Sequence, residues 1–372
     1  MENLDAKVLP FEIELIYNMQ LPKKVKTGML TADLTSEPLK LAIIHFSMGH
    51  VGTLITHLPR EATLIDLSNE LVIFQYKTDI ISSWAFADFT GNKTQEFIVA
   101  DCLQHSLSIF ETTHGNLIKT LTFDSRESIP SDILPLSIPS ANKTREETYL
   151  LIAGNNHPLY LYHRNTSTPN VVLKPPRPLS NFGLVNALSI YPSGDNNNLR
   201  YLVITGTQPQ KILKFLKKDK AFAWIYQLKD IDISSGLHAD SFSFLAQMPL
   251  KLNPRQIAIN QAISQMAVMG DLTFVYGYDL KNYRQAWKYK LYLWPNRLIS
   301  IPYIHDYHPL NHTYLIIAGQ FLICLDQFGK RIFKHQFRKL SDILYVPPND
   351  NVWKQHLLLT MGTRSIEIYS LS

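Results

Sequence analysis

The most constraining feature of the sequence is a short apolar run that ends at a small or polar residue and recurs along the chain. In one copy, Tyr314 to Ala318 stops at Gly319, a second apolar run spans Phe321 to Leu325, and a more polar run surrounds Phe333. Continuous apolar runs of four to eight residues between turn signals are typical of strands covered on both faces. This unit therefore predicts β-structure that is packed from both sides.

The same run-and-stop pattern occurs seven times. The stops are Gly49, Asp101, Gly154, Gly206, Gly270, Gly319 and Gly362. Successive stops are 52, 53, 52, 64, 49 and 43 residues apart. Self-similarity at this spacing, with strand signals in every copy, indicates a propeller array. We therefore predict an all-β chain that folds as a seven-bladed β-propeller with four strands in each blade.

This repeat predicts a single β-propeller domain over residues 1–372. The predicted blades are 24–77, 79–124, 131–174, 182–229, 240–292, 297–337 and 339–371 plus 9–18. The last blade has no room for a fourth strand at the C-terminal end, whereas Phe11 to Tyr17 alternates as a strand does. We expect this N-terminal strand to complete the last blade and to cover its open edge.

The 64-residue interval makes the fourth blade irregular. It predicts an insertion near residues 230–240 or within 252–262, where a short helix would fit. In that blade we place Ile212 and Phe215 on the third strand, and Trp224 and Tyr226 on the outer strand.

Composition points to an ordinary soluble chain. The formal charge is +5 and the isoelectric point about 8.9, which is too mild for the footprint of a dedicated nucleic-acid binder. Cys102 and Cys324 are the only cysteines and do not make a disulfide framework. The first residues lack the basic and apolar regions of a signal peptide, and no apolar run approaches the roughly 20 residues of a membrane span. A cytoplasmic location is expected.

Several segments resemble known propeller families. Ala87 to Ala100, with sequence ADFTGNKTQEFIVA, resembles an FG-GAP-type repeat, and Phe274 to Asp279 followed by Trp287 is similar to quinoprotein-like repeats. The overall layout is similar to WD40-like propellers, although none of the five Trp residues is followed by Asp. These resemblances imply the propeller fold. FG-GAP calcium loops require alternating Asp residues, but this turn has Thr90 and Asn92, so no calcium site is carried over.

Motifs for metal binding and catalysis are few in the sequence. His305, His308 and His312 supply three imidazoles that could bind zinc, but their spacing matches no standard finger, and a solvated loop is the alternative. The sequence has no Gly-x-Ser-x-Gly elbow and no phosphate loop, and neither Cys has a basic neighbour to activate it. We therefore predict no catalytic residue, no metal and no cofactor.

Basic residues cluster in the predicted turns between the third and outer strands of blades three to six. They are Arg164, Lys217, Lys218, Lys220, Lys281, Arg284, Lys330 and Arg331, against the acidic residues Asp219, Asp279 and Asp326. Equivalent turns lie on one face of a propeller, so these residues predict a basic arc for an acidic protein, an acidic lipid or a nucleic acid. A solvated rim is the alternative reading.

Polar residues follow the apolar runs and predict a second surface, on the opposite face near the channel mouth. They are Asp101, His105, Asn155, Asn156, His157, Gln208, Gln210, Asp271, Gln320 and Arg364. Convergent polar groups at a mouth suit a peptide or small ligand. The same residue types also form turns by bonding to their own backbone, which is the structural alternative.

Together these features predict a non-catalytic scaffold for protein interactions, either as a monomer or as a subunit of a larger assembly. A propeller enzyme or ligand-binding protein that uses the channel mouth is the first alternative. Binding of an acidic lipid or a nucleic acid through the basic arc is the second.

Overall fold

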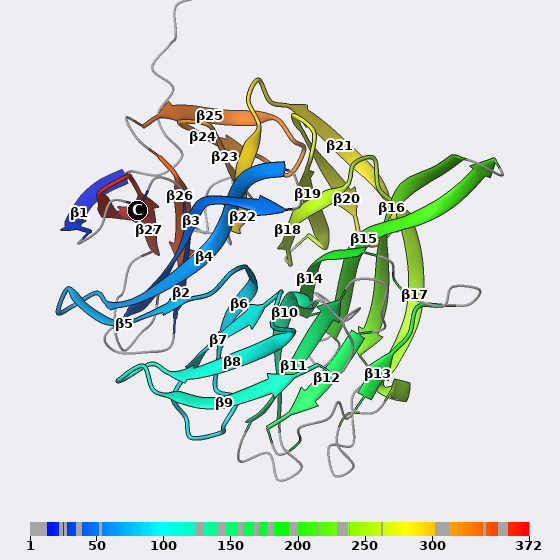
Figure 1. Cartoon of the computed structure of the whole chain (residues 1–372). Coiled ribbons are helices and arrows are strands. Elements are labelled where there is room, and N and C mark those ends of the chain that lie inside the picture. Colours follow the sequence, from blue (N-terminus) through cyan, green and yellow to red (C-terminus); the bar gives the residue numbers. More distant parts are fainter. Residues whose placement is uncertain are drawn as a thin grey trace, which may run out of the picture. The chain divides into compact units, whose positions relative to one another are not determined.

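The computed structural model describes most of the chain. The described residues are 13–21, 25, 28–34, 39–51, 54–123, 130–139, 146–154, 159–164, 166, 171–176, 182, 184–192, 200–213, 216–228, 237, 239–261, 263–301, 313–337, 340–348 and 356–371. Their strands form seven four-stranded sheets, of which six follow the order of the chain and one has the order β1-β28-β27-β26 (Figure 1). The predicted all-β, seven-bladed propeller is confirmed.

The first four blades follow the chain from β2 to β17. Their strands are β2 (Gly28–Asp33), β3 (Lys40–Val51), β4 (Leu54–Asp66) and β5 (Leu71–Lys77); β6 (Ile81–Ala87), β7 (Glu96–Asp101), β8 (Ser106–Glu111) and β9 (Leu117–Thr122); β10 (Pro130–Pro139), β11 (Glu146–Gly154), β12 (Leu159–His163) and β13 (Val171–Leu173); and β14 (Leu184–Pro192), β15 (Arg200–Leu213), β16 (Leu216–Leu228) and β17 (Phe242–Pro249). A short 3-10 helix, η2 (Ala239–Ser241), precedes β17.

The remaining strands build blades five to seven. They are β18 (Pro254–Asn260), β19 (Gln265–Gly270), β20 (Phe274–Asp279) and β21 (Arg284–Lys290); β22 (Pro295–Ile301), β23 (Thr313–Ala318), β24 (Phe321–Leu325) and β25 (Arg331–Gln336); and β26 (Asp342–Val346), β27 (His356–Met361), β28 (Ser365–Leu371) and β1 (Ile13–Gln20). The chain divides into two compact units, residues 1–30 with 256–372 and residues 31–255, and each is described by itself.

The N-terminal strand completes the last blade, as the sequence predicts. β1 pairs antiparallel with β28 from Ile13 opposite Leu371 to Gln20 opposite Ser365. The pairing covers an edge of β28 that would otherwise expose its backbone donors and acceptors. Met19, on β1, is only 1% exposed, so the strand also contributes to the packing.

The strands of the fourth blade differ from the sequence prediction. Trp224 and Tyr226 lie on the third strand, β16, while Ile212 lies on the second strand, β15, and Phe215 falls outside the described residues. The outer strand is Phe242–Pro249, which the prediction had placed in blade five. The cause is a long hairpin, in which β15 has 14 residues and β16 has 13 (Figure 1). The segment considered for a helix at 252–262 contains strand β18 instead.

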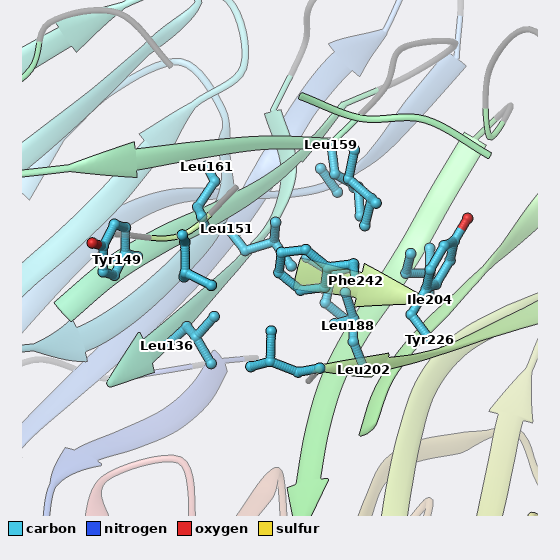
Figure 2. Close-up of a cluster of buried hydrophobic side chains, with 14 of the residues drawn as sticks. Leu136, Tyr149, Leu151, Leu159, Leu161, Leu188, Leu202, Ile204, Tyr226 and Phe242 are labelled. Atoms are coloured by element: carbon cyan, nitrogen blue, oxygen red, sulfur yellow. The ribbon is translucent and has the colours of Figure 1, made fainter. Parts of the chain in front are cut away.

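The core lies between blades, where facing sheets interdigitate. Figure 2 shows one such cluster, in which Leu136 and Leu151 from blade three pack with Leu188 and Ile204 from blade four. Trp224 belongs to the same cluster and is fully buried. The second and third strands are covered on both faces, which explains why their sequences are continuously apolar rather than alternating.

Inner strands are also joined by polar side chains. An oxygen on one inner strand accepts a hydrogen bond from a backbone amide of another blade's inner strand. These bonds join Asp132 to Leu188 at 2.8 Å, Gln256 to Leu298 at 2.9 Å and Asp342 to Leu30 at 2.5 Å. Asp132 and Asp342 each stand second in the tetrapeptide Ser-Asp-Ile-Leu, which recurs at 131–134 and 341–344. The repeat therefore includes a polar connection as well as an apolar run.

Candidate functional site

Four exposed apolar side chains lie near the junction of blades five and six, and we call them the link patch. They are Leu272, Tyr292, Leu293 and Trp294. Tyr292 is 85% exposed and Trp294 is 58% exposed. Such large aromatic side chains are mostly buried in folded proteins unless they meet a partner. This concentration of apolar surface is the kind that marks an interaction site.

Backbone contacts bring the members of the link patch together. Leu272 lies in the turn between β19 and β20, and the other three form the link from β21 to β22. The Leu291 amide at the start of the link donates to the Thr273 carbonyl at 2.8 Å, which holds the link beside that turn. Leu293 reaches the next turn, because a Cβ added to Gly319 would lie 2.7 Å from its Cδ1.

Another link in the chain shows that these aromatic residues are not required by the fold. The link between β17 and β18 reads Leu-Lys-Leu-Asn before Pro254, and the link of the patch reads Leu-Tyr-Leu-Trp before Pro295. In both links the backbone amide of the first Leu donates to a backbone carbonyl. The Leu250 amide donates to the Ala221 carbonyl at 2.9 Å, as the Leu291 amide does to the Thr273 carbonyl. Lys251 and Asn253 thus occupy the positions of Tyr292 and Trp294 in a link with the same Leu-x-Leu-x-Pro sequence and the same first contact.

Gly319 is expected to be needed for the shape of the link patch. Its φ is +61°, a conformation that costs other residues about 1–2 kcal/mol, and a new Cβ would push Leu293 outward. We expect Gly319→Ala to lower the free energy of unfolding by about 1–2 kcal/mol, measured by urea titration. The neighbouring exposed Gln320→Ala is the control and should stay within about 0.5 kcal/mol. An equal loss of unfolding free energy in both variants would contradict a role for the contact between Gly319 and Leu293.

Four residues of the predicted basic arc lie in the predicted type of turn. Lys281 precedes Arg284, at the start of β21, in the turn after β20, and Lys330 precedes Arg331, at the start of β25, in the turn after β24. All four side chains are exposed. Both turns join the third and outer strands of their blades, and the two blades follow one another in the same unit.

Arg164 also lies in the predicted type of turn, after β12, but its guanidinium is engaged by the neighbouring blade. Its Nη1 donates to the Thr90 carbonyl at 3.2 Å. A Cβ added to Gly91, which has φ +74°, would lie 1.7 Å from the same atom. Gly91 therefore makes room for Arg164, and the arginine connects two turns of one unit.

Lys217, Lys218 and Lys220 do not lie in a turn between the third and outer strands, and this part of the prediction is wrong. They belong to β16 and pair with the end of β15, so Lys218 stands opposite Gln210 and Lys220 opposite Gln208. The long hairpin places these lysines at the other end of the third strand. Gln208 and Gln210, expected on the opposite surface, are thus their cross-strand neighbours.

Two of the polar residues predicted for the channel mouth, Asp101 and His105, lie at the turn between β7 and β8. Asp101 is fully buried, and its Oδ1 accepts bonds from the Leu103 and Gln104 amides at 2.9 and 3.0 Å. Its other oxygen accepts a bond from the Thr78 hydroxyl. His105 has a positive φ of 49° and its carbonyl accepts a bond from the Phe123 amide. These contacts explain the residue types by the needs of the turn.

The other predicted mouth residues are dispersed over several turns. Asp271 lies after β19, and the exposed Gln320 and Arg364 lie in the turns after β23 and β27. The carbonyls of Gln320 and Arg364 accept bonds from the Phe337 and Leu21 amides at 3.0 and 2.7 Å. The three residues Asn155, Asn156 and His157 fall outside the described residues.

The loop that resembles an FG-GAP repeat is closed by its own backbone. Asp88 accepts bonds from the Gly91 and Lys93 amides at 2.8 and 3.0 Å. Glu96 accepts bonds from the Phe89 and Thr90 amides at 2.7 and 3.2 Å. Burial raises the pKa of Glu96, although these bonds oppose the increase. The carboxylates of this loop therefore serve the turn itself.

Neither a cluster of metal-ligating side chains nor a membrane-spanning helix occurs in the described part of the chain. It contains no group of three or more His, Cys, Asp or Glu side chains arranged to hold a metal ion. The His305, His308 and His312 cluster lies outside it. No helix within the described ranges is long and apolar enough to cross a bilayer. Cys324 is buried and Cys102 is half-buried, and burial raises the pKa of the Cys102 thiol.

Comparison with known proteins supports the fold. No family model matches the chain, and no curated protein matches it. Among 1261 matching chains of solved structures are two crystal structures of BBS1N in complex with ARL6DN, one soaked with mercury and one with lead. Each is 8% identical in sequence over 97% of both chains, with TM-scores of 0.61 and 0.63. At this identity the likeness shows the fold alone: the chain is a seven-bladed β-propeller.

Proposed function

We propose that this chain is a single β-propeller domain that acts in the cytoplasm as a non-catalytic scaffold for protein interactions. We also propose that a protein partner binds at the link patch. The observation that carries the proposal is the exposure of Tyr292 and Trp294 in a link whose equivalent uses Lys and Asn. Tyr and Trp are enriched among residues that dominate interface energies. In the similar structures, BBS1N is itself bound to another protein, ARL6DN.

The chain offers its own replacement for the link patch. In Tyr292→Lys with Trp294→Asn, the link takes the residues found between β17 and β18, so the fold should be kept. Loss of two such anchors is expected to weaken partner binding at least 100-fold, because each costs about 2 kcal/mol or more. The full tagged chain, wild type or variant, is purified from its source cells, and the stoichiometry of co-purifying proteins is measured.

The control is Phe328→Ser, which removes a 74% exposed aromatic side chain in the turn between β24 and β25. We expect the wild type and this control to retain one stoichiometric protein partner and the link variant to lose it. A photo-reactive phenylalanine analogue at position 292 should cross-link that same partner. Equal recovery with all three proteins, or no stoichiometric partner with the wild type, would reject the proposal.

A further inference from the structure

The net charge of the chain is concentrated on two short segments of one unit. Residues 279–290 and 326–336 include seven of the 36 Lys and Arg residues and two of the 31 Asp and Glu residues. The rest of the chain therefore holds 29 of each and is neutral. The cations are Lys281, Arg284, Lys288, Lys290, Lys330, Arg331 and Lys334, all exposed. We call these seven residues, with Tyr283 and Phe328, the basic strip.

Each segment begins with a turn organised by an aspartate. Asp279 Oδ1 accepts a bond from the Lys281 amide at 2.8 Å, and Asn282 Nδ2 donates to Asp279 Oδ2 at 2.6 Å. Asp326 Oδ1 likewise accepts bonds from the Phe328 and Lys330 amides at 2.9 and 2.8 Å. These two acidic groups are thus occupied by their own turns, and the surrounding cations face solvent.

Blade one contains the same turn with different side chains. Asp66 Oδ1 accepts a bond from the Ser68 amide at 3.0 Å, and Asn69 Nδ2 donates to Asp66 Oδ2 at 2.9 Å. The fifth residue has φ +53° in both turns, as Glu70 in blade one and as Tyr283 in blade five. The blade-one turn has Ser68, Glu70 and Leu71 at the positions where the blade-five turn has Lys281, Tyr283 and Arg284. The turn therefore folds without cations or an aromatic ring, so the fold does not explain their presence in blade five.

The two turns of the basic strip carry the same chemistry on neighbouring blades. Each six-residue turn contains one Lys, one aromatic residue and a final Arg, as Asp-Leu-Lys-Asn-Tyr-Arg and as Asp-Gln-Phe-Gly-Lys-Arg. They are close, because a Cβ on Gly329 would lie 2.6 Å from the Trp287 ring of β21. Trp287 is three residues, or about 10 Å, beyond Arg284. The surface thus repeats a unit of cations and a planar ring.

The cations continue from the turns along the outer strands. Lys288 Nζ lies 3.9 Å from the centre of the Phe274 ring, and Lys334 Nζ lies 3.6 Å from that of Phe321. These cation–π contacts hold the ammonium groups in place on the strands. From Arg284 to Lys290 the strand covers about 20 Å. Exposed cations are therefore present along the outer strands as well as in the turns.

We propose that the basic strip binds single-stranded nucleic acid. Its phosphates would pair with the Lys and Arg side chains, and its bases would stack on Phe328 and Tyr283, since such sites combine a positive track with aromatic platforms. A bilayer touching the turn tips would not reach Lys288, Lys290 and Lys334 farther along the strands. The centre of a protein interface is depleted of charged residues, whereas this surface has seven exposed cations and two exposed aromatic rings.

The test uses fluorescence anisotropy with the full chain and labelled 20-nucleotide oligo(U) RNA and oligo(dT) DNA, over a salt series. In one variant the blade-five turn receives the residues of the blade-one turn, through Lys281→Ser, Tyr283→Glu and Arg284→Leu. We expect at least tenfold weaker binding and a salt slope reduced by about 1.4, because two cations are lost at about 0.7 each. Phe328→Ala should weaken binding about tenfold and leave the salt slope unchanged, since only stacking is lost.

The control makes the same change in charge elsewhere. Lys77→Ser with Lys174→Glu replaces two exposed lysines with one neutral and one acidic residue, and should bind as the wild type does. Equal affinity of the turn variant and this control would overturn the proposal. So would the absence of wild-type binding at 50 mM salt, or binding to phosphatidylserine vesicles or polyglutamate with no binding to either oligonucleotide. The link variant Tyr292→Lys with Trp294→Asn keeps the basic strip and should retain nucleic-acid binding.

Discussion

Asp342→Ala is expected to lower the free energy of unfolding by about 3–5 kcal/mol. The carboxylate lies at the start of β26, is 1% exposed, and accepts a bond from the Leu30 amide at 2.5 Å. Its other oxygen lies 3.5 Å from Arg297 Nε, and the Arg297 side chain is itself mostly buried. Truncation would leave a buried amide without its acceptor and a guanidinium without its counter-ion, and both losses are costly.

Urea titration at pH 7 measures this loss. Asp342→Asn keeps one oxygen for the Leu30 amide but removes the charge, so it should lose less stability than Asp342→Ala. The control is Asp240→Ala, at an exposed position in η2, which should change stability by no more than about 0.5 kcal/mol. If Asp342→Ala and Asp240→Ala lost the same amount, the connection between the inner strands would not matter for stability.

The blades themselves follow from local sequence. A run such as Leu150 to Ala153 is buried throughout, and it needs to be apolar on both faces because sheets pack against both sides of it. The N-terminal strand was predictable for a related reason, since a blade with three strands leaves an edge that the chain must cover. The strand ends at Gln20 rather than at the predicted residue 18, because the alternating pattern marks a strand better than its ends, and residues 9–12 of the predicted range lie outside the described residues.

Blade four shows where local pattern fails. The aromatic residues Trp224 and Tyr226 were interpreted as an outer strand, but aromatic residues suit any pleated surface with packed neighbours. A strand that extends beyond its blade keeps the same backbone periodicity, so the sequence of residues 200–228 does not mark where the pairing with the other strands of the blade ends. That ambiguity displaced Lys217, Lys218 and Lys220 to the wrong end of the third strand.

The candidate sites were predictable in part for the same physical reasons. Lys281, Arg284, Lys330 and Arg331 were placed in turns because an Asp-rich turn after an apolar strand is a local signal. The link patch was missed, although the repeated Leu-x-Leu-x-Pro pattern at 250–254 and 291–295 would have marked Tyr292 and Trp294 as departures. The bonds of Asp132 and Asp342 connect residues 56 and 312 positions apart, so no local pattern could identify their partners.

Asp132 is expected to make stability depend on pH between about 4 and 6. Its carboxylate accepts bonds from the Ser83 hydroxyl at 2.9 Å, the Ile133 amide at 2.9 Å and the Leu188 amide at 2.8 Å. Burial nevertheless dominates these bonds and raises its pKa from 3.8 to about 6. The folded protein thus binds a proton in this window that the unfolded chain has released.

The sign of the effect follows from that difference. Because the folded state holds more protons between pH 4 and 6, the free energy of unfolding falls as pH rises through the window. A shift of about two pKa units corresponds to about 3 kcal/mol, and Asp132 retains some exposed surface, so we expect a loss of about 1–3 kcal/mol. The contribution is complete below pH 4 and absent above pH 6.

Comparison with Asp132→Asn isolates this contribution from the other titrating groups. The amide cannot ionise, whereas Glu96 and Asp342, whose pKa values are also raised by burial, titrate alike in both proteins. Urea titrations at pH 4, 5, 6 and 7 should show the stability of the wild type falling relative to the variant by about 1–3 kcal/mol. A difference that stays constant, or one that grows in favour of the wild type as pH rises, would mean that the three donated bonds outweigh burial and keep Asp132 ionised.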